Sequence, residues 1–233
     1  MKRLGIIGGL GPDATLYYYR TLIDLSRSFL SPGCKHPDRE IVIYQVNQNR
    51  CADDMESGRW EAVTETLVEA AGRLQAAGAD FAVIASNTPH MVFDEVQRRT
   101  SIPLLSIVEE TCKVVADRKL KKVGMLATRI TMQGGFYQKV FGRQGIHLVV
   151  PEEAEQARIH QKITNELVAG ILREETRREL MEVAHRMVRD DNIEGVILGC
   201  TELPLILTQE EPGLPFFNTS LIHARAAFQQ TVS

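Results

Sequence analysis

Val83-Ile84-Ala85-Ser86-Asn87-Thr88 and Val196-Ile197-Leu198-Gly199-Cys200-Thr201 are two similar hexapeptides in a chain of 233 residues. Each begins with an apolar run that predicts a buried strand. Each then has a small residue that can move a proton and ends in a threonine, with Asn87 between the two in the first hexapeptide, and we expect a helix to start there. Two such strand ends facing each other would place one reactive group on each side of a small ligand. The groups differ, because one is a serine hydroxyl and the other a cysteine thiol.

Strand and helix patterns alternate along the whole chain. Residues 60–78 and 175–191 have helical spacing with charged outer faces. Such alternation indicates parallel sheets with crossover helices, an α/β architecture. Short apolar runs predict strands at residues 3–9, 39–46, 80–86, 102–107, 121–128, 146–151, 194–200 and 214–218.

The order of these elements repeats once. Gly5-Ile6-Ile7 and Gly124-Met125-Leu126 are corresponding strands, and the two hexapeptides correspond at a similar offset. A repeat of two units predicts a pseudo-symmetric pair of domains. We assign residues 1–108 plus 213–233 to the first domain and residues 109–212 to the second. Ligands bind beyond the carboxyl ends of parallel strands, so the cleft between the halves is the expected site.

Composition narrows the class of protein. A formal net charge of −3 gives no electrostatic reason to expect a nucleic-acid partner. The amino terminus turns glycine-rich too early for a signal peptide, and no apolar run approaches the length of a membrane span, so we expect a cytoplasmic protein with no membrane partner. Cys34, Cys51, Cys112 and Cys200 have no paired metal spacing, which predicts free thiols and no metal site.

Four separated segments of the chain form a distinctive set: GIIGGLGPDAT (5–15), ASNTPH (85–90), GMLATRITMQGGFYQK (124–139) and LGCTELPLI (198–206). In order and spacing, over essentially the full chain, they resemble the aspartate/glutamate racemase family. The resemblance implies a racemase of an acidic amino acid that needs no cofactor, built as two pseudo-symmetric α/β domains and commonly a homodimer. It also implies one catalytic residue from each domain, here Ser86 and Cys200.

Inverting a stereocentre without a cofactor requires two acid/base groups that flank the α-carbon. A helix N-terminus and nearby donors can shift a thiol toward thiolate, which suits Cys200 to the task. The family usually has a second cysteine where this chain has Ser86. A hydroxyl is a poorer base than a thiolate, so we expect the two directions of racemisation to have unequal rates. Cys200 would deprotonate the L form, and Ser86 would reprotonate the opposite face. Alternatively, Ser86 is a helix cap and Cys200 a small buried side chain.

Further residues are candidates for substrate contact. A side-chain carboxylate needs a cation, which Arg50 or Arg158 could supply unless each is a surface ion pair. Glu202 could orient the substrate ammonium or favour a helix N-terminus, and Leu10 stands where the family often has methionine. His90 and His160 lie near the motifs but fit ordinary helix starts. The remaining candidates are Asn47, Asn87, Thr88, Thr131 and Thr201.

Two other functions stay open at this point. Related decarboxylases operate with a single cysteine, so a chain without the first cysteine could be a lyase. A catalytically weak amino-acid-binding protein is the third possibility. The glycine-rich loop after the first strand lacks the spacing of a dinucleotide fingerprint, so we expect no nucleotide cofactor there.

Overall fold

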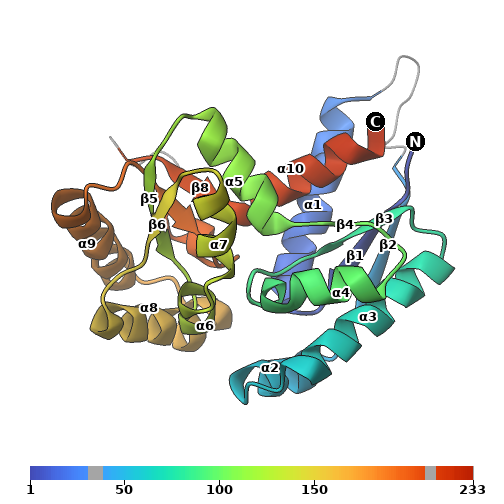
Figure 1. The fold of residues 1–233 in the computed structure, drawn as a ribbon, viewed down its shortest axis with the longest axis horizontal. Coiled ribbons are helices and arrows are strands. Elements are labelled where there is room, and N and C mark those ends of the chain that lie inside the picture. The colour runs from blue at the N-terminus through green and yellow to red at the C-terminus, as the bar shows by residue number, and fades with distance from the viewer. Residues whose placement is uncertain (31–38, 208–213, 233) are drawn as a thin grey trace. The chain divides into compact units, whose positions relative to one another are not determined.

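The computed structural model describes residues 1–30, 39–207 and 214–232 (Figure 1). The chain forms two compact units, the first made of residues 1–110 and 220–233 and the second of residues 111–219. Cys34 lies outside the described residues.

A parallel sheet of four strands forms the centre of the first unit, in the order β2-β1-β3-β4. The residues of β1 and β3 are all buried, because helices cover both faces, and this burial explains their uninterrupted apolar sequences. The strands are β1 (Leu4–Gly8), β2 (Ile41–Gln45), β3 (Phe81–Ile84) and β4 (Leu104–Leu105).

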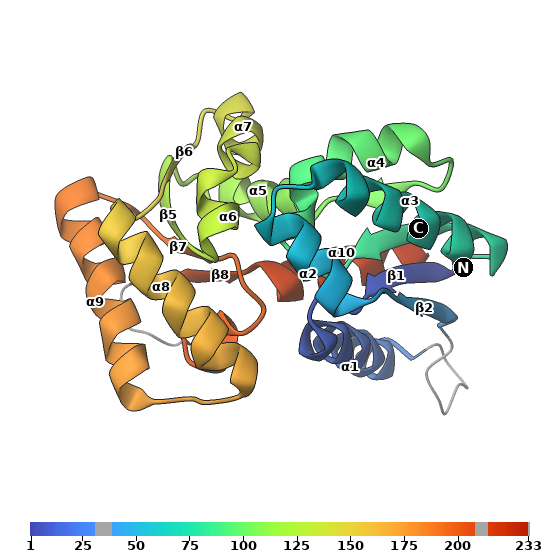
Figure 2. The ribbon, with the colours of Figure 1, turned by 90° about the horizontal axis from the view of Figure 1, so that it is seen from below.

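Two apolar clusters hold helices on the two faces of this sheet. On one face, α3 (Trp60–Ala76) and α4 (Phe93–Arg99) pack over the sheet with α2 (Gln48–Glu56) beside them. On the other face, α1 (Pro12–Ser28) and α10 (Thr219–Val232) bury Tyr18, Leu22 and Phe228 against β1 and β3. Figure 2 shows α3 and α4 on one side of the strands and α1 on the other.

The second unit repeats this topology, with a parallel sheet in the order β6-β5-β7-β8. The prediction of two α/β units, each a parallel sheet flanked by helices, is therefore confirmed. The strands are β5 (Lys122–Leu126), β6 (His147–Val149), β7 (Val196–Leu198) and β8 (Phe216–Asn218). The helical elements are α5 (Ile107–Asp117), which enters from the first unit, α6 (Arg129–Gln133), α7 (Phe136–Arg143), α8 (Glu153–Asn165), the 3₁₀ helix η2 (Leu167–Ala169) and α9 (Glu174–Asp191).

One expected boundary differs from the observed units. Residues 213–233 were assigned together to the first domain, but β8 pairs with β7 in the second sheet. Ordered backbone pairing therefore keeps residues 216–218 in the second unit, and the chain returns to the first unit only within α10.

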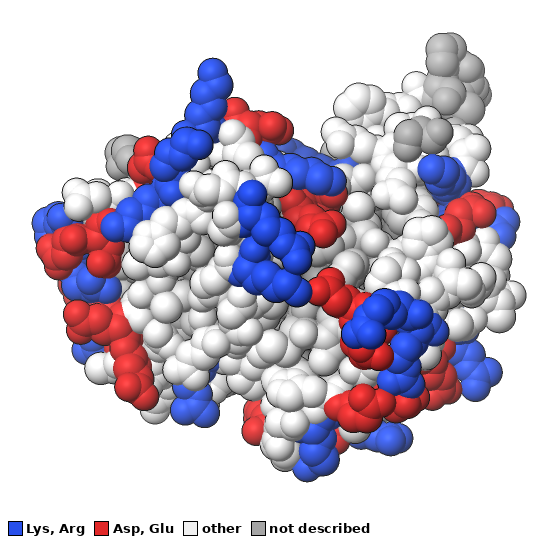
Figure 3. Space-filling view, viewed as in Figure 1, with Lys and Arg blue, Asp and Glu red and all other residues white. Residues whose placement is uncertain are grey.

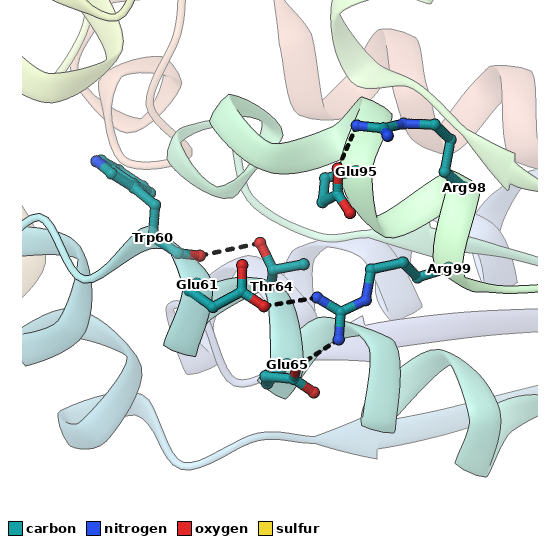
Figure 4. Close-up of polar contacts among 7 residues, drawn as sticks. All are labelled: Trp60, Glu61, Thr64, Glu65, Glu95, Arg98 and Arg99. Atoms are coloured by element: carbon teal, nitrogen blue, oxygen red, sulfur yellow. Dashed lines mark hydrogen bonds and ion pairs between the residues drawn. The ribbon is translucent and has the colours of Figure 1, made fainter.

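Ion pairs tie helices together within each unit. In the first unit, Arg99 of α4 reaches α3, where it pairs with Glu61 at 2.8 Å and also with Glu65 (Figure 4). In the second unit, two nitrogens of Arg186 on α9 donate hydrogen bonds to the carboxylate of Glu155 on α8, at 2.6 and 2.8 Å. The second pair is much less exposed, so it holds its helices more firmly.

Candidate functional site

The carboxyl ends of β1, β2 and β3 lie at one edge of the first sheet, because these strands are parallel neighbours. The loop after β1 is tight: the N–H of Gly9 donates to the Thr15 hydroxyl at 2.9 Å. Gly9 has a φ of 80°, and a Cβ there would lie 2.6 Å from the carbonyl oxygen of Val46. The loop thus requires glycine, and it presents the partly buried Leu10 at this edge.

Asn47 and Arg50 follow β2 at the same edge. The side-chain oxygen of Asn47 accepts a hydrogen bond from the backbone N–H of Arg50 at 3.1 Å and thereby caps α2. This cap occupies the oxygen but leaves the amide NH₂ of Asn47 for another partner. The guanidinium of Arg50 is exposed and forms no ion pair with any other described residue. It is therefore a cation available to an anionic ligand.

Ser86 lies in a sharp turn directly after β3. Its N–H donates to the carbonyl of Ile84 at 2.8 Å, and its own carbonyl accepts from Nδ1 of His90 at 2.9 Å. The side chain is half-buried, and its hydroxyl makes no hydrogen bond to another described residue. Ser86 is not the helix cap considered above, since Asn87 occupies that position. The Ser86 hydroxyl is thus held at the sheet edge without a structural partner in the described chain.

Asn87 and Thr88 continue from this turn. Asn87 is almost fully buried, and Thr88 begins a short 3₁₀ helix, η1 (Thr88–Val92), which leads into α4. The first sheet edge therefore brings six of the predicted site residues together, at the ends of three adjacent strands: Leu10, Asn47, Arg50, Ser86, Asn87 and Thr88.

In the second unit, the ends of β5 and β7 also lie side by side. Gly199 donates its N–H to the carbonyl of Leu126 at 2.8 Å. A Cβ on Gly199 would lie 2.4 Å from the Met125 side chain, so glycine lets the two strand ends approach. Thr131 lies in α6, the helix that follows β5, and is fully buried. Its hydroxyl is 3.0 Å from that of Thr128.

Cys200 follows Gly199 and keeps a half-buried thiol. The thiol donates to Oε2 of Glu202 at 2.8 Å, and the Thr201 hydroxyl donates to the same oxygen at 2.7 Å. Burial raises the pKa of Cys200 well above its usual value, and the Glu202 carboxylate raises it further. The backbone N–H groups of Thr201 and Glu202 face the sulfur and oppose this increase in the pKa, but do not overcome it.

Two expectations about Cys200 need correction. A thiol shifted toward thiolate was expected, whereas burial and then the Glu202 carboxylate raise the pKa of Cys200 and so favour the protonated thiol. A helix N-terminus was expected after each hexapeptide, whereas the element that follows directly is a short 3₁₀ helix in both cases: η1, which continues into α4, and η3 (Leu203–Leu205). Each turn has proline at its first or second position, Pro89 and Pro204, where the missing N–H removes a donor that could face a ligand.

Arg158 makes no hydrogen bond or ion pair to Cys200, Thr201 or Glu202, all of which lie in the described part of the chain. Arg158 lies on α8 and lines a groove of about 310 Å³ between α8 and α9, whose walls include Lys162, Glu179 and Arg189. The same groove contains neither Cys200 nor Glu202. Of the two candidate cations, Arg50 is thus the one that lies at a sheet edge with other predicted site residues.

His223 and Thr219 had no signal in the sequence, although both support the sheet edges. The Thr219 hydroxyl donates to the carbonyl of Leu198 at 2.9 Å, two residues before Cys200. His223 lies on α10 and contacts the carbonyl of Leu105 through Nε2 at 3.0 Å. Both contacts span a large sequence separation, so spacing alone could not reveal them.

Basic and acidic side chains are interspersed on the face drawn in Figure 3. Within residues 1–30, 39–207 and 214–232, no group of three or more His, Cys, Asp or Glu is arranged to hold a metal ion. No helix in those ranges has the length and apolar character needed to cross a membrane.

Comparisons with known proteins agree with this fold. RacX, a broad specificity amino-acid racemase from Bacillus subtilis, is 25% identical over 225 residues, which cover 96% of this chain and 95% of the relative. An aspartate racemase homologue from Pyrococcus horikoshii OT3 is 36% identical with a TM-score of 0.86, and 100% of each chain is covered. An aspartate racemase from Picrophilus torridus, 21% identical with a TM-score of 0.73, shares the fold over 100% of this chain and 95% of its own.

The duplicated α/β fold with these relatives defines an isomerase of the amino-acid racemase class. The model of the Asp/Glu/hydantoin racemase family matches residues 7–227. The chain belongs to that family.

Proposed function

We propose that this protein racemises an acidic amino acid, aspartate, glutamate or a related compound, without a cofactor, with Cys200 and Ser86 as the two proton-transfer groups. The observation that carries the proposal is the placement of a proton-bearing group at the same position in both repeats, at the end of the third strand of each unit. Each group has a hydroxyl or amide residue directly after it, which is suited to holding a carboxylate.

Cys200 removes the α-proton of the L form. The Cα–H bond breaks, its proton passes to the sulfur, and its electron pair moves into the substrate carboxylate, where N–H and hydroxyl donors stabilise the charge. Burial is the largest cause of the raised Cys200 pKa, and the Glu202 charge adds to it. The thiolate needed for this step forms when the substrate ammonium pairs with Glu202 and neutralises that added charge. The thiol proton leaves to water, and the N–H groups of Thr201 and Glu202 stabilise the thiolate.

Ser86 completes the inversion. Its O–H bond breaks and the proton goes to the opposite face of the α-carbon, after which the alkoxide regains a proton from water. A hydroxyl without a structural partner in the described chain is suited to this donation. Removal of a proton from the D form by Ser86 is harder, since a hydroxyl is a weak base. At saturating substrate, turnover of the L form is therefore faster than turnover of the D form, while kcat/KM is equal in the two directions because the enantiomers have equal free energy.

Arg50 holds the side-chain carboxylate of the substrate, and the exposed, unpaired state of its guanidinium supports this role. Asn47, Asn87, Thr88 and Thr201 supply polar contacts, and Leu10 supplies an apolar wall. Thr131 is buried against Thr128, so its part is to shape the edge rather than to contact the substrate directly.

Incubation of L- and D-aspartate and L- and D-glutamate in deuterated water, followed by chiral separation and mass detection, tests the proposal. Inversion with deuterium at the α-carbon is the expected result. Release of carbon dioxide would instead indicate a lyase, and ligand binding without exchange would indicate an amino-acid-binding protein. Cys200→Ala serves as the blank, because it lacks the group that removes the proton.

We also propose that the protein works as a homodimer in the cytoplasm. On α1, Leu16 and Tyr19 are exposed and three positions apart, so they form one apolar strip that a second copy could cover. The free thiols of Cys51, Cys112 and Cys200 suit a reducing compartment. Light scattering during gel filtration tests the dimer, and Leu16→Glu should convert it to a monomer.

A further inference from the structure

We propose that His90 is a positioning residue that fixes Ser86 for proton transfer, held in one neutral tautomer by the backbone of the neighbouring strand end. This inference rests on the proposed role of Ser86. All the contacts that carry it lie within the first unit.

His90 holds the peptide group that carries the Ser86 side chain. Its Nδ1 contacts the Ser86 carbonyl at 2.9 Å, while the Ser86 N–H is bound by Ile84. The turn is therefore fixed on both sides of the Ser86 α-carbon, which limits where the hydroxyl can point. Phe93 stacks on the imidazole with ring centroids 5.1 Å apart and ring planes 5° from parallel, so the ring plane is fixed as well.

The partners of His90 define its tautomer. A carbonyl oxygen only accepts, so Nδ1 must carry the proton that it donates to Ser86. The N–H of Ile107 points at Nε2 from 3.2 Å, so Nε2 must be the unprotonated acceptor. The His90 side chain is only 3% exposed, and both of its nitrogens form hydrogen bonds within the protein. His90 is therefore not placed to exchange a proton with the substrate. If the His90 ring were protonated, its Nε2–H would face the N–H of Ile107, and the two donors would repel each other.

A second buried histidine supports the strand end to which His90 is tied. Nε2 of His223 donates to the Leu105 carbonyl at 3.0 Å, so its Nδ1 accepts from the Tyr18 hydroxyl at 2.8 Å. Leu105 lies two residues before Ile107, the donor to His90. The contacts thus run without a break from Tyr18 and His223, through the end of β4 and His90, to Ser86.

Two substitutions at His90 separate its contacts. The side-chain NH₂ of His90→Asn lies near the former Nδ1 and can still donate to Ser86. The amide of His90→Gln reaches the former Nε2 position, so it keeps the Ile107 contact and loses the Ser86 contact. His185→Gln, at an exposed position of α9, is the matched control.

The assay in deuterated water compares two rates from the L substrate. Deuterium entry into recovered L substrate reports the Cys200 step, and formation of the D enantiomer requires Ser86. His90→Gln should lower D formation about 10-fold to 100-fold with little change in deuterium entry into L substrate. His90→Asn should stay within about threefold of the parent in both rates. The inference would be overturned if His90→Gln lowered both rates equally, or if His90→Asn lowered D formation as much as His90→Gln does.

Nitrogen NMR of the imidazoles gives a readout that does not depend on turnover. We expect His90 to carry its proton on Nδ1 at neutral pH, and the Ser86 amide signal to move in His90→Gln but not in His90→Asn. A proton on Nε2, or equal movement of the amide signal in both variants, would overturn the positioning role. If the parent enzyme neither exchanges nor inverts, the proposed function fails, while these signals still decide the role of His90.

Discussion

The thiol of Cys200 donates a hydrogen bond to Oε2 of Glu202 at 2.8 Å. A carboxylate two positions along the chain thus stabilises the protonated thiol, the opposite of what a nucleophile or base usually needs. Under the proposed mechanism, substrate binding relieves this contact, so substitution of Glu202 should change the reactivity of the thiol.

Glu202→Gln should lower the pKa of Cys200, because it removes the negative charge that opposes thiolate formation. Burial still raises the pKa, so the shift is partial. Iodoacetamide reacts with thiolate, and we expect alkylation of Cys200 at pH 8 to become about 10-fold faster in the free variant. Peptide mapping measures the rate, with Glu61→Gln on α3 as the control. An unchanged rate would show that Glu202 does not control the thiol.

Ser86→Cys should raise the slower direction of racemisation more than the faster one. A thiol is a better acid and forms a far better base than a hydroxyl, so removal of the proton from the D form gains most. Separate initial rates at saturating concentrations of each enantiomer measure the effect. Ser86→Ala should abolish inversion in both directions, and the idea fails if Ser86→Cys leaves the ratio of the two rates unchanged.

Arg50→Ala should raise KM for a dicarboxylic amino acid by about 10-fold to 100-fold, the loss expected for a charge-assisted contact of about 1.5–3 kcal/mol. The guanidinium binds substrate and transition state alike, so kcat should change much less. Arg158→Ala is the matched variant, since Arg158 lies in the groove between α8 and α9. A larger KM effect at Arg158 than at Arg50 would reverse the assignment of the carboxylate contact.

Acid should destabilise the first unit through its two buried histidines. Burial lowers the pKa of His90 to about 4 and that of His223 to about 3, the latter also because the other histidine is near. Both rings stay neutral in the fold while the unfolded chain takes up protons below its ordinary histidine pKa of about 6.5. Their stabilisation is therefore complete above that pH and decreases as the pH falls toward 4.

Urea titrations between pH 7 and pH 5 measure this effect. Each histidine should contribute a slope of up to about 1.4 kcal/mol per pH unit to the free energy of unfolding. His90→Asn should remove one of the two contributions. A slope that is the same in the parent and in the variant would contradict the assignment of the neutral ring.

Two arginines should differ in what they contribute to stability. Arg99→Ala should lower the free energy of unfolding by less than about 1 kcal/mol, because its partners Glu61 and Glu65 are well exposed. Arg186→Ala should cost about 2–3 kcal/mol, because it leaves the buried carboxylate of Glu155 without its two-nitrogen contact. Thermal and urea unfolding measure both, and equal losses would show that burial does not set the difference.

The sequence predicted every strand of both sheets, because buried parallel strands appear as short apolar runs between turn residues. The duplicated order was visible for the same reason. The repeat also predicted which strand ends carry Ser86 and Cys200. Register and the return of residues 216–218 to the second sheet were not predictable, since they depend on pairing between distant segments.

The electrostatics of the site were harder to predict than its residue identities. Spacing places Glu202 two residues after Cys200, but only the fold shows that the chain turns its carboxylate back onto the thiol. In the same way, His90 was visible in the ASNTPH segment while its tautomer depends on Ile107, which is 17 residues away. Side-chain direction and burial decide both cases, and neither can be read from residue types alone.

The first unit is assembled from two separate stretches of chain, and this has a consequence during synthesis. The apolar face over β1 and β3 is completed by Ala224, Ala227 and Phe228. As the chain leaves the ribosome, that face stays open until these residues emerge, long after β1. The second unit is continuous in sequence, so it can finish folding while the apolar face over β1 and β3 is still exposed. The segment translated first is therefore the last to complete its apolar core.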